Sequence, residues 1–256
     1  MKTLLQIENC TVQFGGLKAV SGFDLTIREN ELIGLIGPNG AGKTTIFNLI
    51  TGVYRPTSGE IRFRDRSVVG HPPYKITARG IARTFQNIRL FPSLTVFDNV
   101  RAACNLHLRH GISHALWRGP SFDREEREVE KTASELLEIF HLQHLREAPS
   151  TGLPYGDQRR LEIVRALATR PKLLLLDEPA AGMNPTEKEE LMRLIRFTQE
   201  KFGLAVLLVE HDMRVVMGIC QRIAVLDHGT KIAEGTPETV RADPKVIEAY
   251  LGDTDA

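Results

Sequence analysis

The sequence predicts an α/β fold, in which a largely parallel sheet is covered by helices on both faces. Continuous apolar runs indicate the buried strands, and these runs are 32–36, 173–176, 205–209 and 223–226. Helix signals lie between them, since Asn184-Pro185 is a typical start and Gly203 a typical stop. A glycine-rich stretch, 37–45, directly follows the first run. Strands that alternate with helices along a chain are typical of a parallel sheet.

The composition fits one large globular domain, or a domain with a subdomain. The 256 residues are 42% hydrophobic and 25% charged, which allows a substantial core. Lys and Arg number 33 against 32 Asp and Glu, so the chain has no general attraction to nucleic acid or acidic lipid. We therefore expect no nucleic-acid partner, and we expect any membrane contact to be made to protein.

We expect the chain to stay in the cytosol. Residues 1–9 lack the apolar stretch of a signal peptide, and no run approaches the length that spans a bilayer. Cys10, Cys104 and Cys220 are far apart and odd in number, and none has the C-x-x-C spacing of a metal site. This pattern favours a reducing compartment over a disulfide framework.

The N-terminal part predicts strands of a second kind. Residues 4–12 and 23–27 alternate apolar and polar side chains, as half-buried antiparallel strands do, and 61–63 indicates another short strand. Phe14 follows the first strand beside the turn Gly15-Gly16. The pattern alone favours a core position for Phe14 over an exposed one.

The middle and the end of the chain predict helices. Thr95 is a typical helix start, and 125–145 has apolar side chains at helical spacing. We expect a helical subdomain at about 87–165 and a C-terminal tail of capped helices at about 236–256.

The stretch 105–123 within this region is irregular. His107, His110 and His114 have a spacing that could place three imidazoles on one helix face, where a solvated face is favoured over a metal site. Trp117 is either a docking anchor or a local core residue, and the sequence leaves both open.

The stretch 37–45 matches the phosphate-binding pattern G-x-x-x-x-G-K-[ST] at every specified position. Glycines let such a loop curl around an anion, and a helix that begins near Lys43 adds its positive dipole end. The Lys43 ammonium would reach the outer phosphates, and the Thr44 hydroxyl would help to hold Mg²⁺. The expected nucleotide-binding residues are Gly37, Pro38, Asn39, Gly40, Ala41, Gly42, Lys43, Thr44 and Thr45. Because strand and helix signals flank the loop, a plain structural turn is disfavoured and a nucleoside triphosphate is the expected ligand.

Polar residues follow the predicted strands at the edge where ligands bind in α/β sheets. Asp177 follows four leucines and would complete the Mg²⁺ shell, while Glu178 would polarise the attacking water. His211 could contact the γ-phosphate or hold Glu178 in place, although a lone strand-end histidine is more often a surface residue. Gln86 follows the strand-like 81–85, a position from which it could sense nucleotide and transmit a movement.

A second glycine turn precedes an amphipathic helix within 153–167. The N-terminus of such a helix is a second anion site. One fold seldom needs two sites for one nucleotide, so we infer that the second serves the nucleotide of a partner subunit.

The order of these motifs resembles the nucleotide-binding subunit of an ABC transporter, and the resemblance covers almost the whole chain. It implies a P-loop NTPase core of the RecA-like type, with an antiparallel β subdomain and a helical subdomain, over residues 1–256. It also implies ATP and Mg²⁺ as ligands, with adenine stacked on Phe14, and two ATPase subunits that face each other head to tail.

The resemblance assigns roles to individual residues. The implied catalytic residues are Lys43, Gln86, Glu178 and His211. The implied metal ligands are Thr44, Gln86 and Asp177. The implied signature, offered to the partner's ATP, is Leu153, Pro154, Tyr155, Gly156, Asp157 and Gln158.

Two positions depart from the family pattern. Pro154 stands where the signature serine is usual, and Asn184 stands where the loop after the acidic pair usually has a carboxylate. The site offered to the partner is either weaker than usual or built differently. The chain's own phosphate loop, Asp177 and Glu178 are expected to remain competent for hydrolysis.

Several stretches narrow the resemblance to one ATPase of bacterial branched-chain amino-acid importers. They are 153–163, 177–185, the insert 105–123 and the ending 244–252. Such systems are similar in using two different ATPases, two transmembrane permease subunits and a periplasmic solute-binding protein. The implied location is peripheral, on the inner face of the cell membrane.

Three alternatives remain at the level of the sequence. The first is an ABC ATPase for another cargo, such as lipopolysaccharide or urea. The second is a non-transport ABC protein of DNA repair or translation, which usually has long coiled coils or two nucleotide domains in one chain. The third is a GTPase, but no Asn-Lys-x-Asp guanine motif occurs.

Overall fold

The computed structural model describes residues 2–107 and 120–251. The strands are β1 (Thr3–Phe14), β2 (Leu17–Arg28), β3 (Leu32–Ile36), β4 (Ser58–Phe63), β5 (Arg66–Ser67), β6 (Ile81–Arg83), β7 (Leu173–Asp177), β8 (Ala205–Val209), β9 (Arg222–Asp227) and β10 (Thr230–Gly235). The α-helices are α1 (Lys43–Ile50), α2 (Pro73–Ala78), α3 (Val96–Cys104), α5 (Pro120–Ile139), α6 (Tyr155–Ala168), α7 (Pro185–Phe202), α8 (Met213–Ile219), α9 (Pro237–Arg241) and α10 (Pro244–Leu251). Short 3-10 turns are η1 (Asn105–His107), η2 (Gln143–Leu145) and η3 (Ser150–Gly152).

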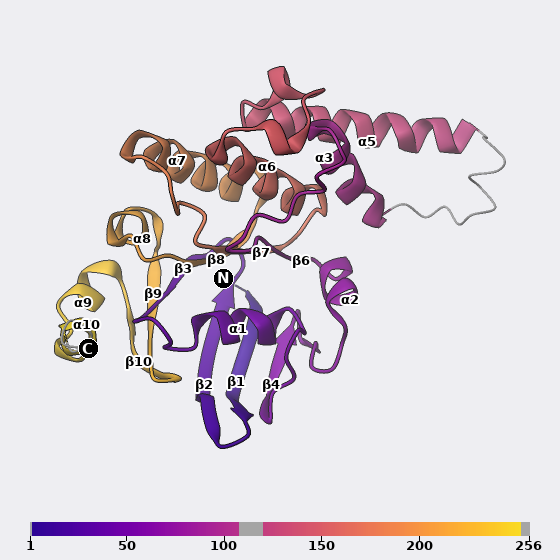
Figure 1. Cartoon of the computed structure of the whole chain (residues 1–256). Helices are drawn as coiled ribbons and strands as arrows, with labels where there is room; N and C mark the ends of the chain where they lie inside the picture. The colour runs from indigo at the N-terminus through magenta and orange to yellow at the C-terminus, as the bar shows by residue number, and fades with distance from the viewer. Residues whose placement is uncertain (1, 108–119, 252–256) are drawn as a thin grey trace.

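The described strands form two sheets (Figure 1). The larger sheet has the order β10-β9-β3-β8-β7-β6, and only its edge strand β10 is antiparallel to its neighbour. The smaller sheet has the order β2-β1-β4-β5 and is antiparallel throughout. The predicted α/β fold with a parallel core and an antiparallel addition is confirmed.

The parallel sheet is buried on both faces because alternate residues of its strands enter two separate apolar clusters. Ile33 and Leu35 of β3 pack with α1 and the antiparallel sheet. Leu32 and Ile36, on the other face, pack with the cluster that includes α3, α5, α6, α7 and α8. Every residue of β7 and β8 is buried, which explains their continuous apolar sequences.

Helix ends follow the capping signals in the sequence. The Asn184 side chain accepts a hydrogen bond from the Glu187 amide, and the Glu187 carboxylate accepts one from the Asn184 amide, so α7 begins with a complete capping box. Gly203 ends the same helix at φ 58°, a left-handed conformation that glycine adopts without steric cost. Thr95 caps α3 by accepting a hydrogen bond from the Asp98 amide.

Two local predictions are wrong. The core position that the pattern alone favoured for Phe14 is wrong, and the resemblance had already reversed it: the strand continues to the hairpin turn, where 46% of the residue is exposed. The strand that begins at Ile81 ends at Arg83 rather than at Phe85. The Thr84 amide still donates to the Leu175 carbonyl oxygen of β7 at 2.9 Å, but the backbone leaves the sheet at Phe85, whose amide donates to the Glu162 carboxylate at 3.2 Å.

Some sequence predictions concern side chains outside the described part of the chain, namely those of His107, His110, His114 and Trp117. Within the described part, no helix has the length and apolar character needed to cross a membrane. The three cysteines are buried and unpaired, as the sequence indicated. Burial raises the pKa of Cys10 to about 11 and that of Cys220 to about 12.

Candidate active site

The stretch 37–45 leaves β3 and curls back into α1, as the phosphate-binding pattern predicts. Gly37 has φ 150° and Gly42 φ 103°, and both positions are tightly packed. A Cβ on Gly37 would lie 1.9 Å from the Leu226 carbonyl oxygen, and one on Gly42 would lie 2.7 Å from the Ala19 carbonyl oxygen. The loop can therefore take this course only with glycine at these two positions.

The start of α1 has the groups that bind an anion. Its N-cap is Gly42, which has no side chain to satisfy the first amides of the helix. The Lys43 ammonium lies at the same place and donates to the carbonyl oxygens of Gly37 and Pro38 at 2.6 and 2.7 Å. Helix amides and a lysine beside a glycine loop fit the phosphates of a nucleotide.

Asp177 and Glu178 lie at the carboxyl end of β7, next to the end of β8. The strands pair in register with Asp177 opposite Val209, and the Glu178 amide donates to the Val209 carbonyl oxygen at 2.9 Å. Glu178 then turns out of the strand with φ 49°, a left-handed conformation that is uncommon for a residue with a side chain. Such strain is found most often at functional sites.

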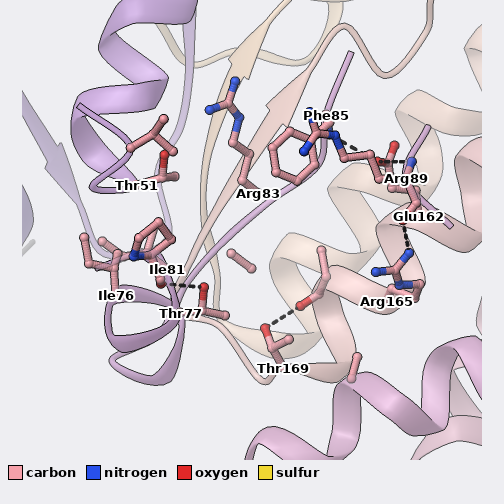
Figure 2. A pocket seen from close by; sticks show the side chains of 15 residues that line it. Thr51, Ile76, Thr77, Ile81, Arg83, Phe85, Arg89, Glu162, Arg165 and Thr169 are labelled. Carbon is pink, nitrogen blue, oxygen red and sulfur yellow. Dashed lines mark hydrogen bonds between the residues drawn. The ribbon is translucent and has the colours of Figure 1, made fainter. Parts of the chain in front are cut away.

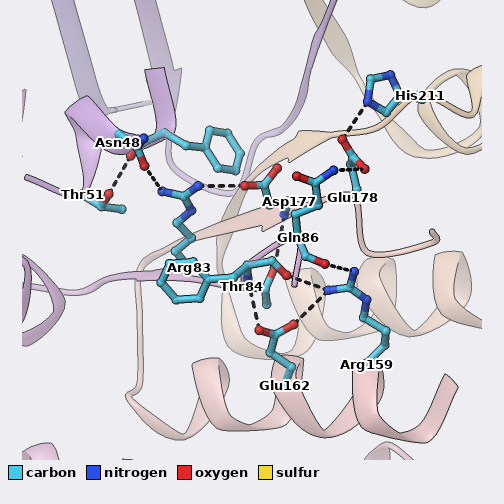
Figure 3. Close-up of polar contacts among 12 residues, drawn as sticks. Asn48, Thr51, Arg83, Thr84, Gln86, Arg159, Glu162, Asp177, Glu178 and His211 are labelled. Carbon is cyan, nitrogen blue, oxygen red and sulfur yellow. Dashed lines mark hydrogen bonds and ion pairs between the residues drawn. The ribbon is translucent and has the colours of Figure 1, made fainter. Parts of the chain in front are cut away.

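The Glu178 carboxylate is held on both oxygens (Figure 3). His211 Nε2 lies 2.7 Å from Oε1, and Gln86 Nε2 donates to Oε2 at 3.1 Å. Of the two contacts that the sequence left open for His211, the one to Glu178 is present. The structure therefore gathers Gln86, Glu178 and His211, from three separate segments, at one edge of the sheet.

Asp177, at this edge of the sheet, and Thr44, in the first turn of α1, carry donor atoms that fit Mg²⁺. A carboxylate and a hydroxyl are hard oxygen donors, which Mg²⁺ prefers. Within the described residues there is no group of three His, Cys, Asp or Glu side chains that could hold a metal ion. Mg²⁺ usually keeps several waters and takes one or two carboxylates plus phosphate oxygens, so a small donor set is sufficient.

Phe14, at the end of β1, and Tyr54, which follows α1, form an exposed aromatic pair. Their ring centroids lie 5.1 Å apart with an interplanar angle of 72°. Both residues are exposed, Phe14 by 46% and Tyr54 by 36%. An exposed ring with a fixed neighbour offers a surface for stacking a flat ligand.

The stretch 153–158 forms the start of α6. Pro154 is the N-cap residue and makes no side-chain cap, so the first amides of this helix are also unpaired by side chains. Leu153 is buried, and the Gln158 side chain fixes it by donating to its carbonyl oxygen at 2.8 Å. Tyr155 is 45% exposed and packs on Gly182, where a Cβ would lie 3.1 Å from the ring.

A buried ion pair joins α6 to the segment that holds Gln86. Arg159 Nη1 lies 3.2 Å from Glu162 Oε2, and the two side chains are only 2% and 6% exposed. Arg159 also donates to the carbonyl oxygens of Phe85 and Gln86, while Glu162 accepts from the Phe85 amide. Burial raises the pKa of the Glu162 carboxyl, and the bonds from the Phe85 amide and Arg159 oppose that rise.

Glu210 supports the loop that follows Glu178. Its buried carboxylate accepts hydrogen bonds from the amides of Ala180 and His211 at 2.7 and 3.2 Å. Burial raises the pKa of this carboxyl, which the amide bonds counteract. Glu210 thus ties the segments of Glu178 and His211 to each other.

A cavity of about 210 Å³ lies beside the Gln86 segment (Figure 2). Its lining residues come from three elements, with Thr77 in α2, Arg83 in β6 and Arg165 in α6. Phe85 and Arg89 also line it, so the cavity borders the residues on either side of Gln86.

Sequence reasoning missed the residues that act through long-range contacts. Those residues are Asn48, Arg83, Arg159, Glu162 and Glu210. A signal existed for two of them: Arg83 interrupts an apolar strand, and Glu162 lies between apolar residues of a helix. A charge in such a place requires a partner.

Two family models match the chain. One, described as "ABC transporter", matches residues 20–181, and one described as "Branched-chain amino acid ATP-binding cassette transporter" matches residues 230–256.

Two curated proteins are similar over nearly their full lengths. The high-affinity branched-chain amino acid transport ATP-binding protein BraF of Pseudomonas aeruginosa is 45% identical over 252 residues, which are 98% of this chain and 99% of BraF. The lipopolysaccharide export system ATP-binding protein LptB of Escherichia coli is 36% identical over 249 residues, which are 97% of either chain.

Solved structures share the fold. The ADP conformation of MJ1267, an ATP-binding cassette of an ABC transporter, has a TM-score of 0.84 at 31% identity, covering 98% of this chain and 100% of that chain. A dimeric post-hydrolysis state of the ATP-binding cassette MJ0796, bound to ADP and Pi, has a TM-score of 0.77 at 27% identity, covering 91% and 99%.

Proposed function

The chain belongs to the ABC transporter family of ATP-binding proteins, and on this premise we propose that it hydrolyses ATP to drive uptake of branched-chain amino acids through separate membrane subunits. Its 45% identity to BraF and the match of its C-terminal residues to a branched-chain amino-acid model support this cargo. Lipopolysaccharide is less well supported, since identity to LptB is 36%.

The observation that carries the proposed chemistry is the Glu178 carboxylate, held by His211 and Gln86 beside Asp177. Glu178 orients and polarises the attacking water, and His211 keeps the carboxylate aimed. Lys43 and the first amides of α1 bind the outer phosphates. Thr44 and Asp177 hold Mg²⁺, which neutralises phosphate charge when bound. Catalysis of this kind needs positioned charges rather than a protein nucleophile.

A second ATPase subunit completes each site in this proposal. The start of α6, residues 153–158, faces the partner's ATP, and its uncapped amides suit a phosphate. Pro154 supplies no hydroxyl, so this half differs from the usual signature and suits an unequal pair of ATPases. Phe14, backed by Tyr54, stacks on adenine.

The cavity beside Gln86 is where we propose that a transmembrane permease subunit docks. A segment bound there would contact Phe85 and Arg89, which flank Gln86 and so connect to Glu178. The helical part at about 87–165 would transmit the movement, and the chain would lie peripherally on the inner face of the membrane. A periplasmic solute-binding protein would act through the permease.

The docking part of the proposal has a matched test. Thr77 lines the cavity and Ala78, one residue further on α2, is exposed and does not. Thr77→Trp should abolish co-purification with the membrane subunits and leave ATP hydrolysis by the free subunit intact. Ala78→Trp should leave both intact, and equal effects of the two changes would contradict this docking site.

Cargo is tested in the reconstituted complex. The chain is purified with its membrane subunits and a solute-binding protein, placed in vesicles, and assayed for ATP hydrolysis with leucine, isoleucine or valine. We expect several-fold stimulation by these amino acids and none by lysine or urea. If only lipopolysaccharide stimulated ATP hydrolysis, lipopolysaccharide and not branched-chain amino acids would be the cargo. A lack of ATP hydrolysis under all conditions would overturn the proposed activity.

A further inference from the structure

Arg83 connects α1 to the end of β7 through a single side chain (Figure 3). Its Nη1 donates to Asn48 Oδ1 at 2.6 Å, and its Nη2 donates to Asp177 Oδ2 at 2.8 Å. The strand register explains why the Arg83 side chain can reach the Asp177 carboxylate, because Arg83 pairs with Leu175, two residues before Asp177.

The ion pair between Arg83 and Asp177 is shielded from water. The two side chains are only 7% and 4% exposed. The guanidinium carbon lies 5.3 Å from the centroid of the Phe47 ring and 5.1 Å from that of Phe85, so aromatic rings pack beside it. A buried charge pair of this geometry is rigid and costly to break from one side.

The backbone of Asp177 is fixed by the same segment. The Asp177 amide donates to the Thr84 hydroxyl at 3.2 Å, and the Thr84 amide donates to the Leu175 carbonyl oxygen at 2.9 Å. Arg83 and Thr84 together therefore set both the position of Asp177 and the rotation of its carboxylate. Within the described residues, the hydrogen bond to that carboxylate is made to Oδ2, by Arg83, and none is made to Oδ1.

We propose that Arg83, supported by Asn48, is a positioning residue that presents Asp177 to Mg²⁺ and thereby sets the metal dependence of nucleotide binding. The proposal rests on the proposed function, in which Asp177 serves Mg²⁺. Arg83 does not touch the nucleotide in this assignment. It acts by holding one carboxylate oxygen, so that the other has a single orientation when the metal arrives.

The test measures how nucleotide binding depends on Mg²⁺ rather than turnover alone. Purified protein is titrated with a fluorescent ATP analogue in EDTA and at a series of Mg²⁺ concentrations. Arg83→Lys keeps a positive charge but cannot bridge Asn48 and Asp177 with a planar fork. We expect it to raise the half-saturating Mg²⁺ concentration about tenfold and to leave affinity in EDTA within about twofold.

Asn48→Ala provides a milder variant that leaves the Arg83–Asp177 ion pair in place, and we expect a smaller shift in the same direction. Arg62→Lys alters an exposed ion pair on β4 and should match the wild-type protein. Electron paramagnetic resonance measures the binding of Mn²⁺, in place of Mg²⁺, to the protein–nucleotide complex. We expect weaker Mn²⁺ binding in Arg83→Lys than in the wild-type protein and unchanged binding in Arg62→Lys.

Two outcomes would overturn the inference while leaving the proposed function intact. One is an unchanged Mg²⁺ dependence in folded Arg83→Lys and Asn48→Ala proteins. The other is an equal loss of affinity with and without Mg²⁺, which a merely structural role would give. If the wild-type protein bound no nucleotide either in EDTA or with Mg²⁺, the proposed function would fail instead.

Discussion

His211 Nε2 lies 2.7 Å from Glu178 Oε1, although the two residues follow different strands and are separated by 33 positions. The carboxylate of Glu210, which precedes His211, accepts a hydrogen bond from the Ala180 amide at 2.7 Å, so a second side chain ties the two segments. A carboxylate held in this manner cannot swing freely, even though the His211 side chain is 47% exposed. The relationship gives Glu178 the fixed direction that a water-orienting group requires.

The first prediction concerns Glu178 itself. Glu178→Gln keeps the size of the side chain but removes the charge that polarises water. We expect ATP binding to persist and turnover to fall by roughly 10²- to 10⁴-fold, the range that general acid–base groups contribute. Single-turnover hydrolysis and equilibrium binding separate the two effects. Glu189→Gln, an exposed position on α7, is the matched control, and near-normal turnover in Glu178→Gln would remove the catalytic assignment.

The second prediction separates the role of His211, which orients the Glu178 carboxylate, from that of Glu178, which polarises the attacking water. His211→Ala removes one of the two side chains that hold Glu178, while Gln86 still donates to Oε2. We expect turnover to fall by roughly 10²-fold, since small misplacements of a reacting group have effects of that size. ATP affinity should change little. A loss of affinity as large as the loss of turnover would instead assign His211 to direct phosphate binding.

The fold was predictable to the extent that side chains reveal their surroundings locally. Continuous apolar runs revealed β7 and β8 because both faces of the sheet are covered. The capping pattern at Asn184 and Gly203 revealed both ends of α7. Phe14 was placed wrongly from the pattern, because periodicity does not tell where a hairpin passes the edge of the core.

The site was predictable where consecutive residues carry the chemistry, as at Lys43 or Asp177-Glu178. It was not predictable where partners come together only through the fold. Arg83 and Asp177 are 94 positions apart, and Arg159 bonds to the Phe85 carbonyl oxygen across 74 positions. Periodicity reports the face on which a residue lies, but it does not identify the residue opposite.

The third prediction concerns pH. Asp212 caps α8 by accepting from the Arg214 amide at 2.9 Å, and it pairs with Lys188 at 2.8 Å. The bond from Lys188 and the Arg214 amide lower the pKa of the Asp212 carboxyl, although partial burial opposes the change. A lowered folded-state pKa stabilises the protein above the unfolded-state value near 4, and this contribution is lost as pH falls through the folded-state pKa.

Asp212→Asn keeps an oxygen that can cap α8 but removes the charge that pairs with Lys188, so it should reduce the free energy of unfolding at pH 7 by about 0.5 kcal/mol, a size typical of partly exposed ion pairs. The difference from the wild-type protein should shrink as pH falls below about 4. Urea unfolding of both proteins at pH 7, 5 and 3 measures this difference in unfolding free energy. Lys188→Met removes the partner of Asp212 and should therefore also weaken the pH dependence of the unfolding free energy. If the difference in unfolding free energy between Asp212→Asn and the wild-type protein stayed constant from pH 7 to 3, the lowered pKa of Asp212 would be contradicted.

The last prediction concerns the tether between α6 and the Gln86 segment. Glu162→Ala leaves the buried Arg159 guanidinium without its carboxylate, and it also removes the acceptor of the Phe85 amide. We expect a loss of about 3–5 kcal/mol in unfolding free energy, the range seen when one member of a buried pair is removed.

The double change Arg159→Met with Glu162→Leu removes both charges and fills the same space, so stability should largely recover. ATP turnover should not recover with it, because Met and Leu cannot hold the Phe85 and Gln86 backbone that Arg159 and Glu162 fix. Chemical denaturation and turnover measured on both variants test the two halves of the argument. If turnover rose together with stability, the tether would serve the fold alone, and Gln86 would find its position without help from α6.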